Sequence, residues 1–158
     1  AGGVPMGGVL SPVTSDQKPS FIIMAAKDPL GANLDRVQIV KAWVDLEGKS
    51  HEQVIDVASA DGRTVDSITN KLPPVGNTVD VATASYLNSI GSTLIHVHWT
   101  DPQFDPALQA LYYARLLEIP TPRWSTYDAV KLGTTPMEPT SIQERAISSA
   151  IWYQPPPS

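Results

Sequence analysis

The chain has 158 residues, of which 42% are hydrophobic and 17% charged, and its formal net charge is −5. This length suits one domain with a core of its own. The acidic balance and the lack of any Lys/Arg-rich run argue against a nucleic-acid partner. No apolar run approaches the ~20 residues of a membrane span. The absence of cysteine excludes disulfides and thiolate metal sites.

The two ends of the chain carry little core-forming sequence. Residues 1–8 are Gly-rich and lack an initiator Met, which predicts that the chain is a fragment of a longer protein. We expect one domain over 1–153, followed by a Pro-rich tail over 154–158 that is extended or unstructured.

The first half of the chain predicts three strands. Residues 20–26 form a short apolar run closed by a turn signal at 27–31, and we expect this strand to be buried on both faces. Residues 36–44 are rich in β-branched side chains and end at 45–49, a hairpin-type connection. Residues 51–58 are the expected hairpin partner.

The second half predicts four more strands, at 79–86, 92–100, 111–119 and 147–153. In 92–100 the alternation places Ile95, Val97 and Trp99 on one face and His96 and His98 on the other. The apolar run at 111–119 is the strongest in the chain. Short helical turns are predicted at 106–109, with Asp105 as N-cap, and at 140–145.

These elements favour an all-β protein. Fifteen prolines cluster at segment boundaries and leave little room for long helices. An open sheet would expose one apolar face to water. We therefore predict an immunoglobulin-like two-sheet sandwich of about seven strands with short helical turns and long Pro-rich loops.

Two pairs of side chains have spacings that metal ions can use. His96 and His98 project from one strand face, as two metal ligands can, but the sequence supplies no further ligand motif, and we favour a solvated sheet face. Asp101 and Asp105 offer the oxygens that Ca²⁺ prefers. They lack the spacing of a calcium loop, so we expect them to accept backbone N–H bonds in turns.

The most informative stretch is 120–128. Pro120 and Pro122 fix their own φ and push the preceding residues toward extended geometry, so a stiff extended loop is predicted rather than a helix. The candidate interface or ligand-facing side chains here and downstream are Arg123, Trp124, Tyr127, Asp128, Glu144 and Arg145. Arg123 could pair with a ligand carboxylate or with Glu144 or Asp128. We favour docking against protein over ligand binding for this loop.

Several stretches together resemble the C-terminal portion of the bacterial domain-of-unknown-function family 3604. They are residues 3–8, 27–41, 72–80, 99–106, 112–128 and 143–153, and the run Pro-Thr-Pro-Arg-Trp at 120–124 is the most specific. The resemblance implies an exported, periplasmic or secreted parent protein. Its N-terminal part would be a metallohydrolase barrel of the polymerase-and-histidinol-phosphatase type, holding a divalent metal.

The sequence contains no Cys nucleophile and no Gly-x-Ser-x-Gly elbow, so no self-contained catalytic site can be named, and no cofactor is expected in this chain. We expect a non-catalytic module that packs on the parent's N-terminal catalytic domain. Two alternatives remain. The chain could contribute a residue to a composite active site of a metal-dependent hydrolase, or it could bind a small anionic or sugar-like ligand by itself.

Overall fold

The computed structural model describes residues 3–10, 17–66, 68 and 71–156. In that part the fold is all-β, as predicted, with one short helix. The elements are β1 (Val9–Leu10), β2 (Ser20–Ala26), β3 (Leu34–Val44), β4 (Ser50–Ser59), β5 (Leu94–Thr100), β6 (Ala110–Glu118), β7 (Thr121–Pro122), α1 (Trp124–Leu132), β8 (Ser141–Ile142), β9 (Arg145–Ile147) and β10 (Ile151–Tyr153).

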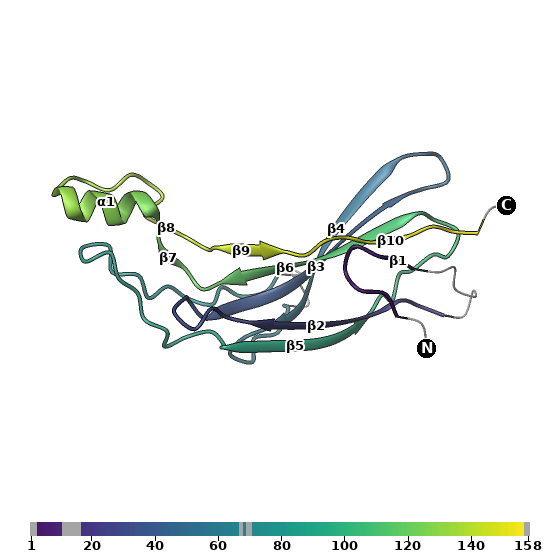
Figure 1. Ribbon diagram of the computed structural model, residues 1–158, viewed down its shortest axis with the longest axis horizontal. Helices are drawn as coiled ribbons and strands as arrows, with labels where there is room; N and C mark the ends of the chain where they lie inside the picture. The colour runs from purple at the N-terminus through teal and green to yellow at the C-terminus, as the bar shows by residue number, and fades with distance from the viewer. Residues whose placement is uncertain (1–2, 11–16, 67, 69–70, 157–158) are drawn as a thin grey trace.

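The strands form two layers of unequal width (Figure 1). The larger layer, sheet A, has the order β1-β10-β6-β3-β4, with β9 also paired to β6. The smaller layer, sheet B, consists of β2 and β5 in antiparallel register. Strands β7 and β8 form a separate two-stranded ribbon. Sheet B therefore covers only part of the face that sheet A presents to it.

Two clusters of buried side chains hold the layers together. One joins Phe21 of β2 to Ile39 and Tyr112 of sheet A, with the Phe21 and Tyr112 ring centroids 4.7 Å apart. The other joins Ala25 of β2 and Ile95 of β5 to residues of β3 that include Val37, which is fully buried. The core thus lies between sheet B and the centre of sheet A.

The two faces of sheet B differ sharply. In β5, Ile95, Val97 and Trp99 point inward and the histidines point outward, as the alternation predicts. The prediction that 20–26 is buried on both faces is wrong, because β2 alternates as well: Ile22 is 85% exposed and Met24 is 77% exposed. The outward side chains of β5 are exposed as well, so no other described element covers the outer face of this two-stranded layer.

The prediction of an extended loop over 120–128 is correct for its first half and wrong for its second. Thr121–Pro122 is strand β7, and Arg123 is still extended, with φ −64° and ψ 149°. The helix α1 then begins at Trp124, because no proline follows Pro122 until residue 136. It ends at Gly133, whose φ of 65° lets the Thr134 N–H reach the Ala129 carbonyl.

Four other expected elements differ from the structure. Residues 79–86 form a turn instead of a strand, because the Asp80 carboxylate accepts the Ala82 N–H and the Thr83 hydroxyl. The helical turn expected at 140–145 is absent, and this segment contributes β8 and the start of β9. The strand expected at 147–153 is two strands, β9 and β10. At 106–109 there is a single turn closed by Asp105 rather than helix.

One glycine is required where the core meets the loop before β5. Gly91 has φ 79°, and a Cβ there would lie 2.7 Å from Ile119 Cγ2 and 2.8 Å from the Leu34 carbonyl oxygen. Its N–H donates to Asp61 at 2.8 Å. The position therefore accepts no side chain, because both the backbone conformation and the surrounding space exclude one.

Among the described residues, no helix is long and apolar enough to cross a membrane. Of the predicted tail, Gln154 to Pro156 form no regular secondary structure, while residues 157 and 158 lie outside the described part, as do residues 1 and 2 at the Gly-rich start.

Candidate functional site

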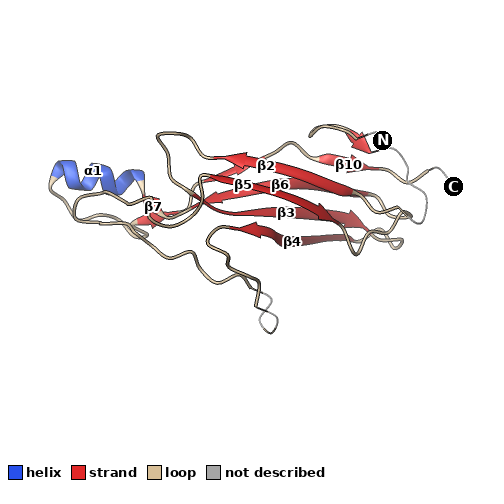
Figure 2. Cartoon of the chain, turned by 90° about the horizontal axis from the view of Figure 1, so that it is seen from below, coloured by secondary structure: helices blue, strands red, loops and turns tan. Residues whose placement is uncertain are grey.

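The helix α1 lies at the far end of the molecule from both termini, where the β7–β8 ribbon carries it away from the sandwich (Figures 1 and 2). We call residues 121–142 the arm. Strand β7 leads directly into α1, and β8 returns the chain to sheet A through β9, which pairs with β6. The arm is therefore an insertion in the connection between β6 and β9, two strands that pair with each other in antiparallel orientation.

Helix α1 buries its small side chains and exposes its large apolar ones, which is the reverse of an ordinary surface helix. We call this arrangement inverted. Its buried residues are the small side chains Ser125, Thr126 and Ala129. Its large side chains face solvent: Trp124 is 65% exposed and Leu132 is 75% exposed. A soluble helix normally turns its apolar stripe toward the core. The exposed aromatic side of α1 therefore has no counterpart in the described part of the chain.

Other large apolar side chains of the arm are exposed as well, namely Tyr127, Val130 and Met137. Trp124, Tyr127 and Val130 follow one another at intervals of three residues, which keeps them close together along the helix surface. The Thr126 hydroxyl donates to the Thr140 carbonyl at 2.7 Å and ties the helix to the returning strand. The arm thus has a defined conformation without burying the large side chains of α1.

Arg123 begins the helix and lies beside Trp124, with its guanidinium carbon 5.9 Å from the indole ring. Among the described residues, no carboxylate lies within ion-pair distance of Arg123. The pairing with Asp128 or Glu144 considered from the sequence is therefore not made. Asp128 is an exposed residue of α1. The guanidinium makes no hydrogen bond within the described part of the chain, and its contact there is with the Trp124 ring.

The candidate residues divide into two groups along the arm. The ladder pairs Thr121 with Ile142, and Glu144 accepts the Glu118 N–H at its carbonyl, at the base of the arm. The Arg123 N–H instead donates to Thr140. Three residues lie between Thr140 and Glu144, and a fully extended chain would place the two at most about 13 Å apart. Arg145 begins β9, exposed, at the same base. The structure therefore groups Arg123, Trp124, Tyr127 and Asp128, and it places Glu144 and Arg145 apart from them.

The base of the arm holds two acidic residues. Burial raises the pKa of the Glu118 carboxyl, and the negative charge of Glu144 raises it further, while Lys27 acts in the opposite direction. The folded state therefore disfavours the charged form of the Glu118 carboxyl.

Replacing Glu118 with glutamine is expected to stabilise the protein at pH 7. A carboxyl whose pKa is raised on folding contributes stability that is complete below the ordinary Glu pKa of about 4.3, and that contribution is lost as the pH rises through the folded-state pKa. The advantage of Glu118→Gln should therefore disappear on acidification to about pH 4. Chemical denaturation across pH measures this, with the exposed Glu47→Gln as control. A variant less stable than the parent at pH 7 contradicts the assignment.

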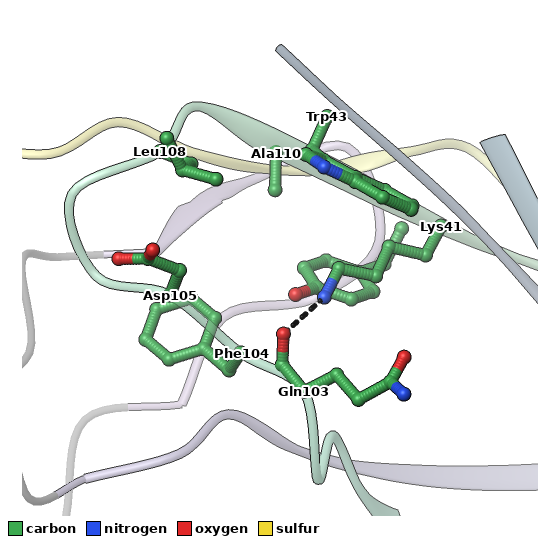
Figure 3. A pocket seen from close by; sticks show the side chains of 8 residues that line it. Lys41, Trp43, Gln103, Phe104, Asp105, Leu108 and Ala110 are labelled. Carbon is green, nitrogen blue, oxygen red and sulfur yellow. Dashed lines mark hydrogen bonds between the residues drawn. The ribbon is translucent and has the colours of Figure 1, made fainter. Parts of the chain in front are cut away.

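A second candidate site is the pocket in Figure 3, which has a cavity volume of about 220 Å³. Lys41 of β3, itself buried, places its ammonium 2.6 Å from an Asp101 carboxylate oxygen and donates to the Gln103 carbonyl at 2.9 Å. The same Asp101 oxygen accepts the Tyr112 hydroxyl at 2.7 Å. The ammonium also lies 5.2 Å from the Trp43 ring centroid. The remaining lining residues are Phe104, Asp105, Leu108 and Ala110.

The polar groups of this pocket satisfy one another. The second Asp101 oxygen accepts the Gln103 N–H at 2.9 Å, which is the turn role predicted from the sequence. Burial raises the pKa of Tyr112, and its hydrogen bond to Asp101 raises it further, so the phenol stays protonated and donates. Lys41, Asp101 and Tyr112 therefore fix the loop after β5 onto sheet A. This arrangement favours a structural role for Lys41, Asp101 and Tyr112 over a role as nucleophile or general base.

A third polar cluster surrounds Asp35, which is completely buried at the start of β3. One carboxylate oxygen accepts Arg36 Nε at 3.0 Å and Gln143 Nε2 at 2.7 Å, and the other accepts Arg63. Arg63 also donates to the Pro73 carbonyl. The cluster thus connects the loop after β4 and the base of the arm to the core.

The histidine pair lies outside all three sites. His96 and His98 stand on the exposed face of β5, opposite Met24 and Ile22. His51, the third histidine, is on β4, where it stacks on Trp43 and binds the Asp45 carboxylate at 2.7 Å. Within the described ranges, no group of three or more His, Asp or Glu side chains is placed to hold a metal ion.

Sequence reasoning missed the Lys41 and Asp35 clusters. Both join residues that are distant along the chain, such as Lys41 with Asp101 and Asp35 with Gln143. A weak signal existed for Lys41, because it is a charged residue within a β-branched strand that the structure places at the centre of sheet A.

The fold and the arm define an all-β, two-layered domain that carries an exposed helical insertion. A family model described as "Protein of unknown function (DUF3604)" matches residues 1–155, and the chain belongs to that family. No curated protein and no solved structure matches the chain.

Proposed function

We propose that this chain is a non-catalytic docking module, and that its arm packs on a catalytic domain of the same protein. The observation that carries the proposal is the inverted helix α1, which buries Ser125, Thr126 and Ala129 and exposes Trp124 and Leu132. Large exposed aromatic and aliphatic side chains gathered on one element are characteristic of interaction surfaces.

The chemistry of the arm suits a protein partner. Trp, Tyr and Arg are the residues that most often dominate binding energy at protein interfaces, and Trp124, Tyr127 and Arg123 are adjacent here. The Arg123 guanidinium has no carboxylate partner among the described residues, so a partner carboxylate would complete it. We further propose, from the family resemblance, that the catalytic partner is a metal-dependent hydrolase barrel and that the whole protein is exported.

Replacing Trp124 with alanine tests this function, because its effect should depend on whether the partner is present. In the isolated chain a side chain that is 65% exposed contributes little, so we expect a change in unfolding free energy below about 1 kcal/mol. In the full-length protein the same change should weaken domain docking by about 2–4 kcal/mol, as for a central interface tryptophan. Thermal unfolding of both forms measures the difference.

The matched control is Leu46→Ala, because Leu46 is 82% exposed on the β3–β4 hairpin, away from the arm. It should have no effect in either form. If Trp124→Ala has the same small effect in both forms, the arm does not dock.

A second candidate function rests on the unpaired Arg123. If the arm completes a composite active site, Arg123→Ala in the full-length protein should lower kcat without changing the melting temperature. If the arm only docks, stability should fall and kcat of the remaining folded enzyme should stay unchanged.

A further inference from the structure

The edge of β2 that faces away from β5 is a second surface that pairs with no other described strand, and it is independent of the arm. Two hydrogen bonds at the ends of the β2–β5 ladder show which residues of β2 bond to β5. The Lys27 N–H donates to the Thr93 carbonyl, and the Asp101 N–H donates to the Pro19 carbonyl. Antiparallel pairs alternate between bonded and non-bonded positions. The backbone N–H and C=O groups of Phe21, Ile23 and Ala25 therefore point toward β5 and bond to it.

The residues between them direct their N–H and C=O groups away from β5. These residues are Ser20, Ile22, Met24 and Ala26. Strand β2 pairs only with β5 in the described part of the chain, and none of these backbone groups makes another hydrogen bond there. The edge therefore offers a row of donors and acceptors with the spacing of a β-strand.

This edge also lacks the usual protection against strand pairing. Natural edge strands carry charges, prolines or bulges that block pairing. Strand β2 contains none of these, and its register with β5 is continuous from Ser20 to Ala26. Its outward side chains Ile22 and Met24 are 85% and 77% exposed.

An apolar groove runs along the same edge. Its cavity volume is about 470 Å³, and its lining comes from β2, from sheet A and from the N-terminal residues Gly3 to Met6. Ile39, Tyr112, Leu116 and Ile151 contribute to its lining on the sheet A side. In Figure 2, β2 is the outer strand of sheet B and lies on the same side of the molecule as β10. A strand added at the β2 edge would direct its inward side chains toward this groove.

We propose that the β2 edge binds one extended segment of a partner polypeptide, which adds as a third strand to sheet B. The segment pairs its backbone with Ser20, Ile22, Met24 and Ala26. It carries apolar side chains at alternate positions, which enter the groove, and uncharged ones between them, which lie beside Ile22 and Met24.

A second copy of this chain does not fit at the β2 edge. Side-by-side antiparallel pairing of two β2 strands places both sandwiches on the same side of the joined sheet. The space beneath the β2 edge is already occupied by this chain's own β6 and β10, as the lining residues Tyr112, Leu116 and Ile151 show. Sheet A of a second copy would overlap with β6 and β10 of the first. A single extended strand has no second sheet and avoids this overlap.

The test uses the full chain and a soluble peptide probe of alternating valine and threonine flanked by lysines. A matched peptide carries N-methyl groups on the edge that would face β2, which removes pairing without changing the side chains. We expect the probe to slow hydrogen exchange at the Ile22 and Met24 amides at least tenfold and the N-methylated peptide to leave exchange unchanged.

Two protein variants localise the binding. Met24→Pro removes an N–H that bonds to nothing in the described structure, and prolines are tolerated on edge strands. It should weaken probe binding at least tenfold. His96→Pro makes the equivalent change on the opposite edge, because His96 is the register partner of Met24, and it should leave binding unchanged. Equal binding of both peptides, or equal loss in both variants, overturns the proposal. So does self-association of the unliganded chain that Met24→Pro abolishes, since the occupant would then be a second copy.

Discussion

Replacing Lys41 with methionine is expected to lower the free energy of unfolding by about 3–5 kcal/mol. Asp101 is 1% exposed, and Lys41 is its only ion-pair partner among the described residues. Methionine would fill the space of the lysine stem, but the carboxylate would remain charged in a buried site with only the Tyr112 hydroxyl and the Gln103 N–H as donors. Urea unfolding followed by circular dichroism measures the loss.

Two further variants separate the buried charge from lost packing. Lys49→Met removes an exposed lysine of the β3–β4 hairpin and should change stability by less than about 0.5 kcal/mol. Adding Asp101→Asn to Lys41→Met neutralises the unpaired carboxylate and should recover at least about 1 kcal/mol. If the double variant is less stable than Lys41→Met alone, the loss comes from packing and our account of the pair is wrong.

The second large effect is expected for Asp35→Asn, which should destabilise the protein by about 3–4 kcal/mol. The carboxylate is fully buried and accepts from Arg36, Arg63 and Gln143. An asparagine amide offers one oxygen in place of two and turns a donor toward an existing donor. Thermal unfolding should show a fall in melting temperature of roughly 10 °C, at 2–4 °C per kcal/mol for a chain of this size.

The control for Asp35 uses the same arginine. Asp56 lies 3.6 Å from Arg36, and its side chain is more exposed than that of Asp35. Asp56 also accepts Gln38 Nε2 at 2.8 Å, a bond that an asparagine oxygen can keep, so Asp56→Asn should cost about 1 kcal/mol, less than Asp35→Asn. If the two substitutions cost the same, burial does not set the strength of the Asp35 cluster.

The central strands could be predicted from sequence because their signals are local. Residues 36–44 and 51–58 carry β-branched side chains on either side of a hairpin turn, and the structure extends both by one or two residues. The alternation in 92–100 also predicted which face of β5 would be buried. Pattern and turn chemistry agree in these strands, and no long-range contact overrides them.

The arm was only half predictable, because a proline restricts its own residue and the one before it but nothing further along the chain. Pro122 therefore keeps Thr121 extended without preventing helix from Trp124 onward. The apolar stripe of α1 could be read from the sequence, but its inversion could not. That inversion depends on which side of the helix meets the β7–β8 ribbon, which local sequence does not specify.

The most direct test of the docking function is amide hydrogen exchange of Trp124–Leu132, compared between this chain and the full-length protein. A helix that buries only small side chains should open readily in the isolated chain. If the arm docks, exchange in these residues should slow at least tenfold in the full-length protein, while exchange in the β3–β4 hairpin stays the same. Equal exchange of α1 in both forms would contradict the proposal that this domain docks through its arm.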